Sequence, residues 1–161
     1  MAAPDKPRPV IVGESNPYGS DADYALYPSP SGCAGDRLCR LVMRIRERTY
    51  LTTFARANLL DGARWTARGA REAALCLRES YQGERVWILL GRKVSDAFGV
   101  GYNAPSVVLG RGGTDVLRPC PVVVLPHPSG RNRAWSDPNL PKLCREYLSR
   151  ELPEVPFGEA P

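Results

Sequence analysis

Histidine is nearly absent from this chain. Among its 161 residues there is one histidine, His127, and there are only three lysines beside nineteen arginines. The five cysteines are odd in number, widely spaced and never arranged as Cys-x-x-Cys: they are Cys33, Cys39, Cys76, Cys120 and Cys144. This usage argues against a disulfide framework and favours a reducing compartment.

Long apolar runs are also missing. Residues 1–8 carry prolines and charges instead of the apolar core of a signal peptide, and no later run approaches the length of a membrane span. We therefore expect a soluble, cytoplasmic protein with no membrane partner. The length and the 43% hydrophobic content suit one domain over residues 1–161, with flexible ends at 1–8 and 153–161. We expect a monomer.

The charge balance is basic. Lysine and arginine together number 22 against 17 acidic residues, which gives a net charge of +5 and a pI of about 9.1. Arginine can bind phosphate through two parallel hydrogen bonds, so the composition is compatible with a nucleic-acid partner. It equally fits a solvated charged surface, and charge alone does not choose between these interpretations.

Predicted strands alternate with predicted helices along the chain. Apolar stretches indicate strands at 10–13, 50–60, 85–90 and 121–125, with 114–117 as an edge strand or part of a hairpin and 101–113 as loop. Helices are expected from Asp36 as N-cap, with Leu38, Leu41, Val42 and Ile45 inward, and at 65–81, 94–98 and 136 or 137 to 152. The pattern predicts a three-layer α/β/α fold around a mostly parallel sheet of about four strands.

Two of the predicted strands open onto polar loops. The apolar run ending at Leu125 leads into His127-Pro128-Ser129-Gly130, and the first strand leads into a long loop, 14–35, that begins Glu14-Ser15-Asn16-Pro17-Tyr18. Open α/β sheets bind ligands beyond the carboxyl ends of their strands. The two loops are therefore expected to face one cleft, and long ordered loops usually carry function.

These two loops resemble the signature loops of the uracil-DNA glycosylase superfamily. Residues 13–18 read G-x-x-N-P-Y and residues 127–132 read H-P-S-G-R-N, in the order found in that superfamily. His-Pro-Ser followed by Arg-Asn is most similar to the single-strand-selective monofunctional branch, and Pro-Ser-Gly with an arginine shortly after resembles the mismatch-specific branch. The cysteines do not reproduce the spacing of the iron-sulfur branch, so we expect neither a metal nor another cofactor.

The resemblance implies a three-layer α/β/α domain and a reaction. It predicts a monofunctional DNA glycosylase of base excision repair, a hydrolase that flips uracil or a related deaminated or modified pyrimidine out of DNA and hydrolyses its N-glycosidic bond, leaving an abasic site. No lysine is placed to form a Schiff base, so strand cleavage is not expected. The partner would be DNA, single- or double-stranded, and the enzyme would be associated with the nucleoid.

The resemblance also assigns catalytic roles. His127 would donate a hydrogen bond to uracil O2, where negative charge collects as the base departs. Asn16 would position the attacking water. Glu14 is its rival, because the loop is one residue longer than Gly-x-Asn-Pro and the iron-sulfur branch begins its loop with Gly-Glu; a carboxylate could act as a general base or stabilise the cationic sugar.

Base recognition is assigned to residues that also have structural interpretations. Tyr18 would crowd the base C5 position, and Tyr18 or Tyr27 would stack on the extruded base or merely cover the end of the sheet. Asn58 would read the Watson-Crick edge of uracil, or form an ordinary turn. Ser15 is expected at the substrate, or in an Asx-type turn with Asn16.

Contacts with DNA are expected from the loop that follows His127. Ser129 and Gly130 would contact phosphate, Arg131 would act as the wedge that replaces the flipped nucleotide, and Arg133 would contact phosphate; a solvated loop is the alternative. Two other functions remain open at this stage. One is a superfamily member that binds damaged or modified DNA without turnover, and the other is a nucleotide- or nucleoside-processing enzyme.

Overall fold

The computed structural model describes residues 7–15, 22–60, 64–109, 117 and 120–160. In chain order its elements are β1 (Val10–Ser15), the 3-10 helix η1 (Ala22–Tyr24), α1 (Ala34–Asp36), the π-helix η2 (Arg37–Met43), α2 (Glu47–Thr53), β2 (Ala55–Leu60), α3 (Ala67–Ser80), β3 (Trp87–Leu90), α4 (Arg92–Ala97), β4 (Ser106–Leu109), β5 (Pro121–Leu125), the 3-10 helix η3 (Arg133–Ser136) and α5 (Leu140–Glu151).

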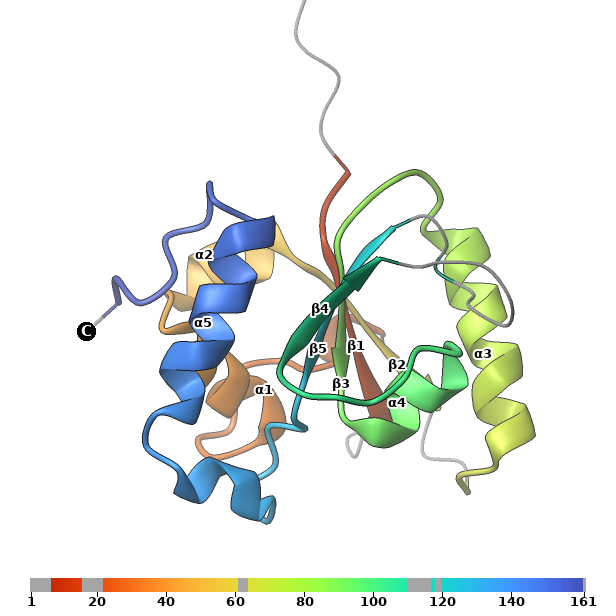
Figure 1. Cartoon of the computed structure of the whole chain (residues 1–161), viewed down its shortest axis with the longest axis horizontal. Helices are drawn as coiled ribbons and strands as arrows, with labels where there is room; N and C mark the ends of the chain where they lie inside the picture. The colour runs from red at the N-terminus through yellow and green to blue at the C-terminus, as the bar shows by residue number, and fades with distance from the viewer. Residues whose placement is uncertain (1–6, 16–21, 61–63, 110–116, 118–119, 161) are drawn as a thin grey trace, which may run out of the picture.

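The strands form one mixed sheet in the order β2-β1-β3-β5-β4. The first four of these are mutually parallel, and β4 runs antiparallel to β5 at the edge. In Figure 1, α1, α2 and α5 cover one face of the sheet and α3 and α4 cover the other. The three-layer α/β/α fold predicted from the sequence is confirmed, with five described strands where about four were expected.

Both faces of the sheet are buried, so its central strands are apolar throughout. Ile88 and Leu90 of β3 point to the side of α2 and α5, whereas Trp87 and Leu89 point to the side of α3 and α4. All four side chains are fully inaccessible to solvent. This is the environment that produces unbroken hydrophobic strand sequences in parallel sheets.

The chain reverses its direction across the sheet at β1. From β1 the chain passes to β2 on one side and returns to β3 on the other side of β1. It then passes to the edge strand β4 and comes back to β5, which lies between β3 and β4. Such a switch in strand order opens a crevice beyond the carboxyl ends of the strands, where helical connections leave in opposite directions. These carboxyl ends lie at the lower edge of the sheet in Figure 1.

Two strand predictions need correction. The segment from Tyr50 to Thr53 belongs to α2, and the strand begins only at Ala55. Tyr50 and Phe54 lie one helical turn apart and are both fully buried, so the aromatic residues that suggested a strand serve a helix face. The segment Ser106–Leu109, predicted as loop, is the edge strand β4. The alternative edge strand at 114–117 falls almost wholly outside the described residues.

The predicted inner face of the first long helix is also wrong in part. Leu41 is 38% exposed, and Cys39 and Met43 are buried in its place. The cause is the π-helical winding of η2, which widens each turn and rotates later side chains relative to an α-helical stripe. The left-handed backbone of Arg44, with φ of 48°, ends the helix.

Asp36 occupies the N-cap position of η2, as predicted, but its side chain makes no capping hydrogen bond there. Cys33 caps α1 because its Sγ accepts a hydrogen bond from the Asp36 N–H at 3.4 Å. The Asp36 carboxylate instead accepts a bond from the Gly32 N–H at 2.8 Å and pairs with Arg40 one turn later. The aspartate therefore joins the loop to η2, where it is almost fully buried.

The C-terminal segment, expected to be flexible, packs against the helical layer. Val155 is buried, and the ring of Phe157 lies 6.4 Å from that of Phe54. The Gly158 N–H donates to the Met43 carbonyl at 2.9 Å, and the Ala160 N–H donates to the Arg44 carbonyl at 3.0 Å. The segment thereby covers the exposed end of η2.

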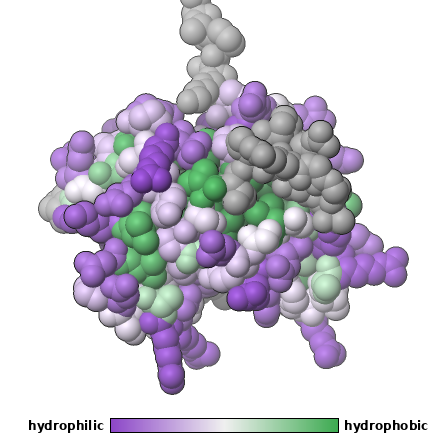
Figure 2. All heavy atoms as spheres, in the orientation of Figure 1, coloured by the Kyte–Doolittle hydropathy of each residue, from purple (hydrophilic) through white to green (hydrophobic). Residues whose placement is uncertain are grey.

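Hydrophilic side chains dominate the face of the molecule shown in Figure 2, with smaller hydrophobic areas over β4 and α5. Leu143 of α5 is 40% exposed. Within the described ranges, every helix is too short or too polar to cross a lipid bilayer.

Candidate functional site

A cavity of about 640 Å³ opens at the carboxyl edge of the sheet. Its walls come from the end of β1, the end of β2, the loop that precedes α1 and the loop that follows β5. The lining residues are Glu14, Ser15, Tyr24, Leu26, Tyr27, Gly32, Cys33, Ala34, Gly35, Asn58, His127, Ser129, Gly130 and Arg131. The cavity therefore lies where the strand order places a ligand site.

His127 is partly buried in the wall of this cavity, and its hydrogen bonding indicates which ring nitrogen carries the proton. The backbone N–H of Ser129 donates to His127 Nδ1 at 3.2 Å, so Nδ1 is an acceptor and the proton of the neutral ring sits on Nε2. Burial lowers the pKa of His127, and the nearby charge of Glu14 opposes that effect in part. The ring is thus a neutral donor near pH 7.

Three side chains fix the backbone around His127. The His127 carbonyl accepts hydrogen bonds from Trp135 Nε1 at 2.7 Å and from Asn132 Nδ2 at 3.1 Å. Arg37 Nε donates to the carbonyl of Pro128 at 2.7 Å, across the gap between η2 and the loop after β5. The histidine loop is therefore held from both ends, and the imidazole needs little rearrangement to meet a ligand.

Glu14 and His127 both lie near Gly91, the residue that follows β3. A Cβ placed on Gly91 would lie 3.8 Å from Glu14 Oε1 and 3.8 Å from His127 Cδ2, and 3.2 Å from His127 Cβ. Because both 3.8 Å distances start from the same point, Glu14 Oε1 and His127 Cδ2 lie in the same neighbourhood, close to Gly91. Gly91 also has φ of +91°, so a side chain there would be both strained and crowded.

Asn58 faces the same region from β2, where it pairs in register with Gly13 of β1. A Cβ on Gly13 would lie 2.5 Å from Asn58 Oδ1, so only glycine leaves room for the amide. Asn58 Oδ1 is buried and accepts no hydrogen bond from the described residues. An acceptor left unpaired in this way is a candidate partner for a ligand N–H.

The loop before α1 is anchored from beneath. Tyr50 donates its hydroxyl hydrogen to the Leu26 carbonyl at 2.8 Å, and Arg56 Nη1 donates to the Ala25 carbonyl at 2.9 Å. The Arg56 guanidinium also lies over the Tyr27 ring, 5.8 Å from its centroid. The buried Tyr50 of α2 and the partly buried Arg56 of β2 thus hold the Tyr27 wall of the cavity in place.

The structure brings together most of the candidate residues that it describes. Glu14, Ser15, Tyr27, Asn58, His127, Ser129, Gly130 and Arg131 all line the one cavity. Arg133 does not line it; this residue is exposed in η3. Asn16 and Tyr18 lie outside the described residues.

Sequence reasoning missed several contributors. Tyr24 and Cys33 line the cavity, and Arg37, Asn132 and Trp135 hold the histidine loop. The tyrosines and glycines of residues 14–35 marked this loop as a candidate, but the sequence did not indicate which of its tyrosines would line the cavity. For Arg37 there was no signal, because its partner lies 91 residues away.

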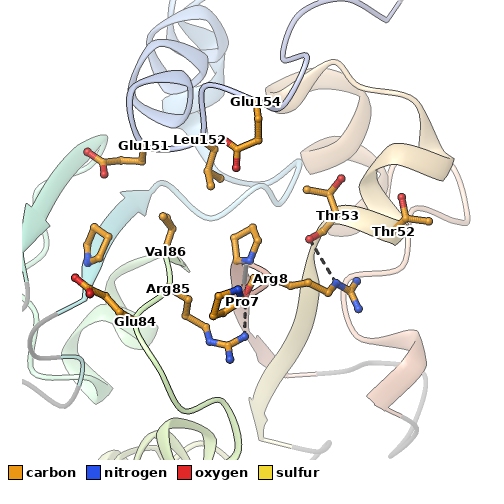
Figure 3. Close-up of a pocket in the computed structure, with 12 residues that line it drawn as sticks. Pro7, Arg8, Thr52, Thr53, Glu84, Arg85, Val86, Glu151, Leu152 and Glu154 are labelled. Carbon is orange, nitrogen blue, oxygen red and sulfur yellow. Dashed lines mark hydrogen bonds between the residues drawn. The ribbon is translucent and has the colours of Figure 1, made fainter. Parts of the chain in front are cut away.

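A second cavity of about 520 Å³ opens at the opposite, amino-terminal edge of the sheet. Figure 3 shows Glu151 and Glu154 on its α5 side, with Arg8 and Arg85 across from them. The guanidinium of Arg8 donates to the carbonyls of Leu51, Thr53 and Phe54, and that of Arg85 donates to those of Arg8 and Gln82. Both guanidinium groups are thus used in hydrogen bonds to the backbone, which join neighbouring segments of the fold. Because they serve the structure in this way, this cavity is the weaker functional candidate.

The described residues contain no group of three or more histidine, cysteine and acidic side chains placed to hold a metal ion. Comparison of the chain with known protein families found no match, and neither did comparison with curated proteins. The chemistry of the cavity is therefore the basis for any functional conclusion.

Proposed function

We propose that this protein is a monofunctional DNA glycosylase that hydrolyses the N-glycosidic bond of uracil or a related deaminated or modified pyrimidine. The observation that supports this most directly is the meeting of Glu14, Asn58 and His127 in one cavity. They come from three different strand ends, and they supply a carboxylate, an amide and a neutral imidazole donor. Glu14 and His127 lie in the two signature-like loops, and Asn58 is the residue that the resemblance assigns to the base edge.

In the proposed reaction the bond between N1 of the base and C1′ of deoxyribose breaks, and its electron pair leaves with the base. Negative charge spreads to O2 of the departing pyrimidine, where His127 Nε2–H donates a hydrogen bond. Because this donor is already oriented by the Ser129 N–H, stabilising the anion costs little reorganisation. The base finally takes up a proton at N1.

The oxygen of water adds to C1′, and a proton must leave that water. Among the described residues that line the cavity, Glu14 is the one carboxylate, and it lies beside His127 at Gly91. Glu14 can accept the proton and can also stabilise the positive charge that develops on the sugar. Asn16, which the family resemblance favours for positioning the water, lies outside the described residues.

Asn58 supports selection of the base. Its amide carries one acceptor and one donor group, which match N3–H and O4 of uracil. The unpaired Oδ1 would accept the N3–H, and cytosine, which has an acceptor at that position, would leave the oxygen unsatisfied. The exposed Gly130 and Arg131, at the mouth of the cavity, are placed to meet the DNA backbone.

The decisive experiment uses an end-labelled oligodeoxynucleotide with a single uracil, in single- and double-stranded form. After incubation and alkali treatment, the wild-type protein should produce alkali-labile ends. His127→Ala should slow their formation about 100- to 1000-fold, the usual cost of losing one oriented donor. Glu14→Gln should also be strongly impaired.

Glu79→Gln is the matched control, because Glu79 is an exposed carboxylate on α3 and does not line the cavity. It should retain wild-type activity. Equal cleavage by wild type and His127→Ala would refute the proposal. A gel shift without alkali-labile product would instead favour a protein that binds modified DNA without turnover.

A further inference from the structure

A smaller hollow adjoins the candidate active site. It has a volume of about 330 Å³ and is lined by Tyr24, Tyr27, Ser29 and Pro30. Tyr24 and Tyr27 also line the site cavity, so the two hollows share a wall made of two aromatic side chains. The two hollows are therefore neighbours, separated by these two side chains.

The two rings differ in burial and in the contacts that they make. Their centroids are 5.8 Å apart and their planes make an angle of 62°, an edge-to-face arrangement. Tyr27 is partly buried, with Arg56 over its ring and with its carbonyl accepting a hydrogen bond from the Cys33 thiol. Tyr24 is 54% exposed, one of the largest exposed hydrophobic side chains described. The partly buried Tyr27 ring thus packs against the exposed Tyr24 ring.

The lining of this hollow indicates the chemistry of its occupant. None of the four described residues that line it carries a charge, so these residues offer a phosphate group no ionic partner. Aromatic rings and a proline offer flat apolar surface, which stacks on any nucleobase without hydrogen-bond selection. Arg131, whose exposed side chain lies at the mouth of the adjoining cavity, is available for the backbone between two bases.

We propose that this hollow is a subsite for the nucleobase next to the excised one, in an unpaired strand. The inference rests on the proposed glycosylase function and adds its substrate class: single-stranded or locally unpaired DNA. A neighbour within a duplex stays stacked and paired, and it reaches Tyr24 only after further unstacking, which costs free energy. An unpaired strand escapes most of that cost.

The test compares pentadeoxynucleotides with a central uracil. In two of them the base on the 5′ or the 3′ side is replaced by an abasic tetrahydrofuran residue. Loss of one of these neighbours should raise KM about 5- to 100-fold, the range expected for one stacked base, with little change in kcat. Tyr24→Ala should abolish that difference, Tyr24→Phe should preserve it, and Leu75→Ala, an exposed side chain on α3, is the control.

A second arm separates this inference from the function on which it rests. Binding of fluorescein-labelled (dT)5, which contains no uracil, is measured by anisotropy for wild type and Tyr24→Ala. If Tyr24→Ala weakens this binding while the wild-type protein excises no uracil from the pentadeoxynucleotides, the subsite is upheld and the glycosylase is rejected. Excision that ignores both neighbours, or that proceeds equally well on duplex and single strand, would overturn the subsite and leave the glycosylase standing.

Discussion

At the scale of single residues, the distinctive feature is how the atoms of His127 are occupied. One ring nitrogen and the backbone carbonyl are engaged with protein groups, whereas Nε2 makes no hydrogen bond to the described residues, and the residue lines the cavity. Burial disfavours the charged ring, so the donor is a neutral N–H. A group arranged in this way can bind developing negative charge without first changing protonation state.

The depressed pKa of His127 predicts a pH-dependent stability. An unfolded chain protonates this residue near pH 6.5, whereas the folded chain resists protonation, so folding free energy is present above that pH and is lost as the pH falls. Urea unfolding between pH 7.5 and 5 should show a smaller decline in His127→Asn than in wild type. A larger decline in the variant would contradict the assigned environment.

Trp135 is expected to act as a positioning residue through the carbonyl of His127. Trp135→Phe keeps an aromatic ring but removes the 2.7 Å hydrogen bond, leaving Asn132 as the remaining side-chain donor. Loss of about 1 kcal/mol should lower kcat about fivefold with little effect on KM. Nitrogen NMR of the His127 ring should show a weakened preference for the Nε2–H tautomer, which a purely structural role would leave unchanged.

At the scale of elements, the site depends on how closely the ends of neighbouring strands approach. β1 and β2 pair in register up to Ser15 and Leu60, and the glycine at position 13 gives the Asn58 side chain its space. Gly91 plays the same part between β3 and the loop after β5. Glycines at two strand ends thus leave room for the side chains of Asn58 and His127, which line the cavity.

Gly13→Ala should therefore displace the Asn58 amide while leaving the overall fold intact. The new Cβ would lie 2.5 Å from Asn58 Oδ1, which must move, and overpacking of this kind costs about 1–3 kcal/mol. Uracil excision should lose its preference over cytosine, measured as a ratio of kcat/KM values. Gly101→Ala, where a Cβ meets nothing within 4 Å, is the control and should match wild type in both stability and preference.

At the scale of the whole molecule, charge determines how the protein meets a polyanion. The net charge is +5, and Arg131 places one of the cations at the mouth of the cavity. Phosphate contacts release counterions, so DNA affinity should fall linearly with the logarithm of salt concentration. Binding to single-stranded DNA is thus expected to be sensitive to ionic strength.

Arg131→Gln should reduce the magnitude of that salt slope by about 0.7, the share of one phosphate contact on a single strand. Arg68→Gln serves as the control, because Arg68 is exposed on α3 and pairs with Glu72 instead of facing the cavity. Anisotropy titrations at several salt concentrations measure both slopes. Identical slopes for wild type and Arg131→Gln would remove Arg131 from the interface.

Patterns close together in the chain predicted most of the fold. The apolar runs at β1, β3 and β5 and the helical periodicity of α3 and α5 are local consequences of burial, so they could be identified without coordinates. The helix at Tyr50 and the strand at Ser106 were missed. Each depends on what lies opposite it: the core beside α2 in one case, and pairing with β5 in the other.

The order of residues along the chain was enough to specify an alternating α/β domain and two polar loops at strand ends, because hydrophobic periodicity and turn chemistry act over short distances. It also made His127, Glu14 and Asn58 visible as candidates. Their convergence required the strand order β2-β1-β3-β5-β4, which places segments more than a hundred residues apart at one edge of the sheet. The contact of Arg37 with Pro128, the choice of tautomer on His127 and the shared wall of Tyr24 and Tyr27 arise from packing between distant segments, which no local pattern encodes.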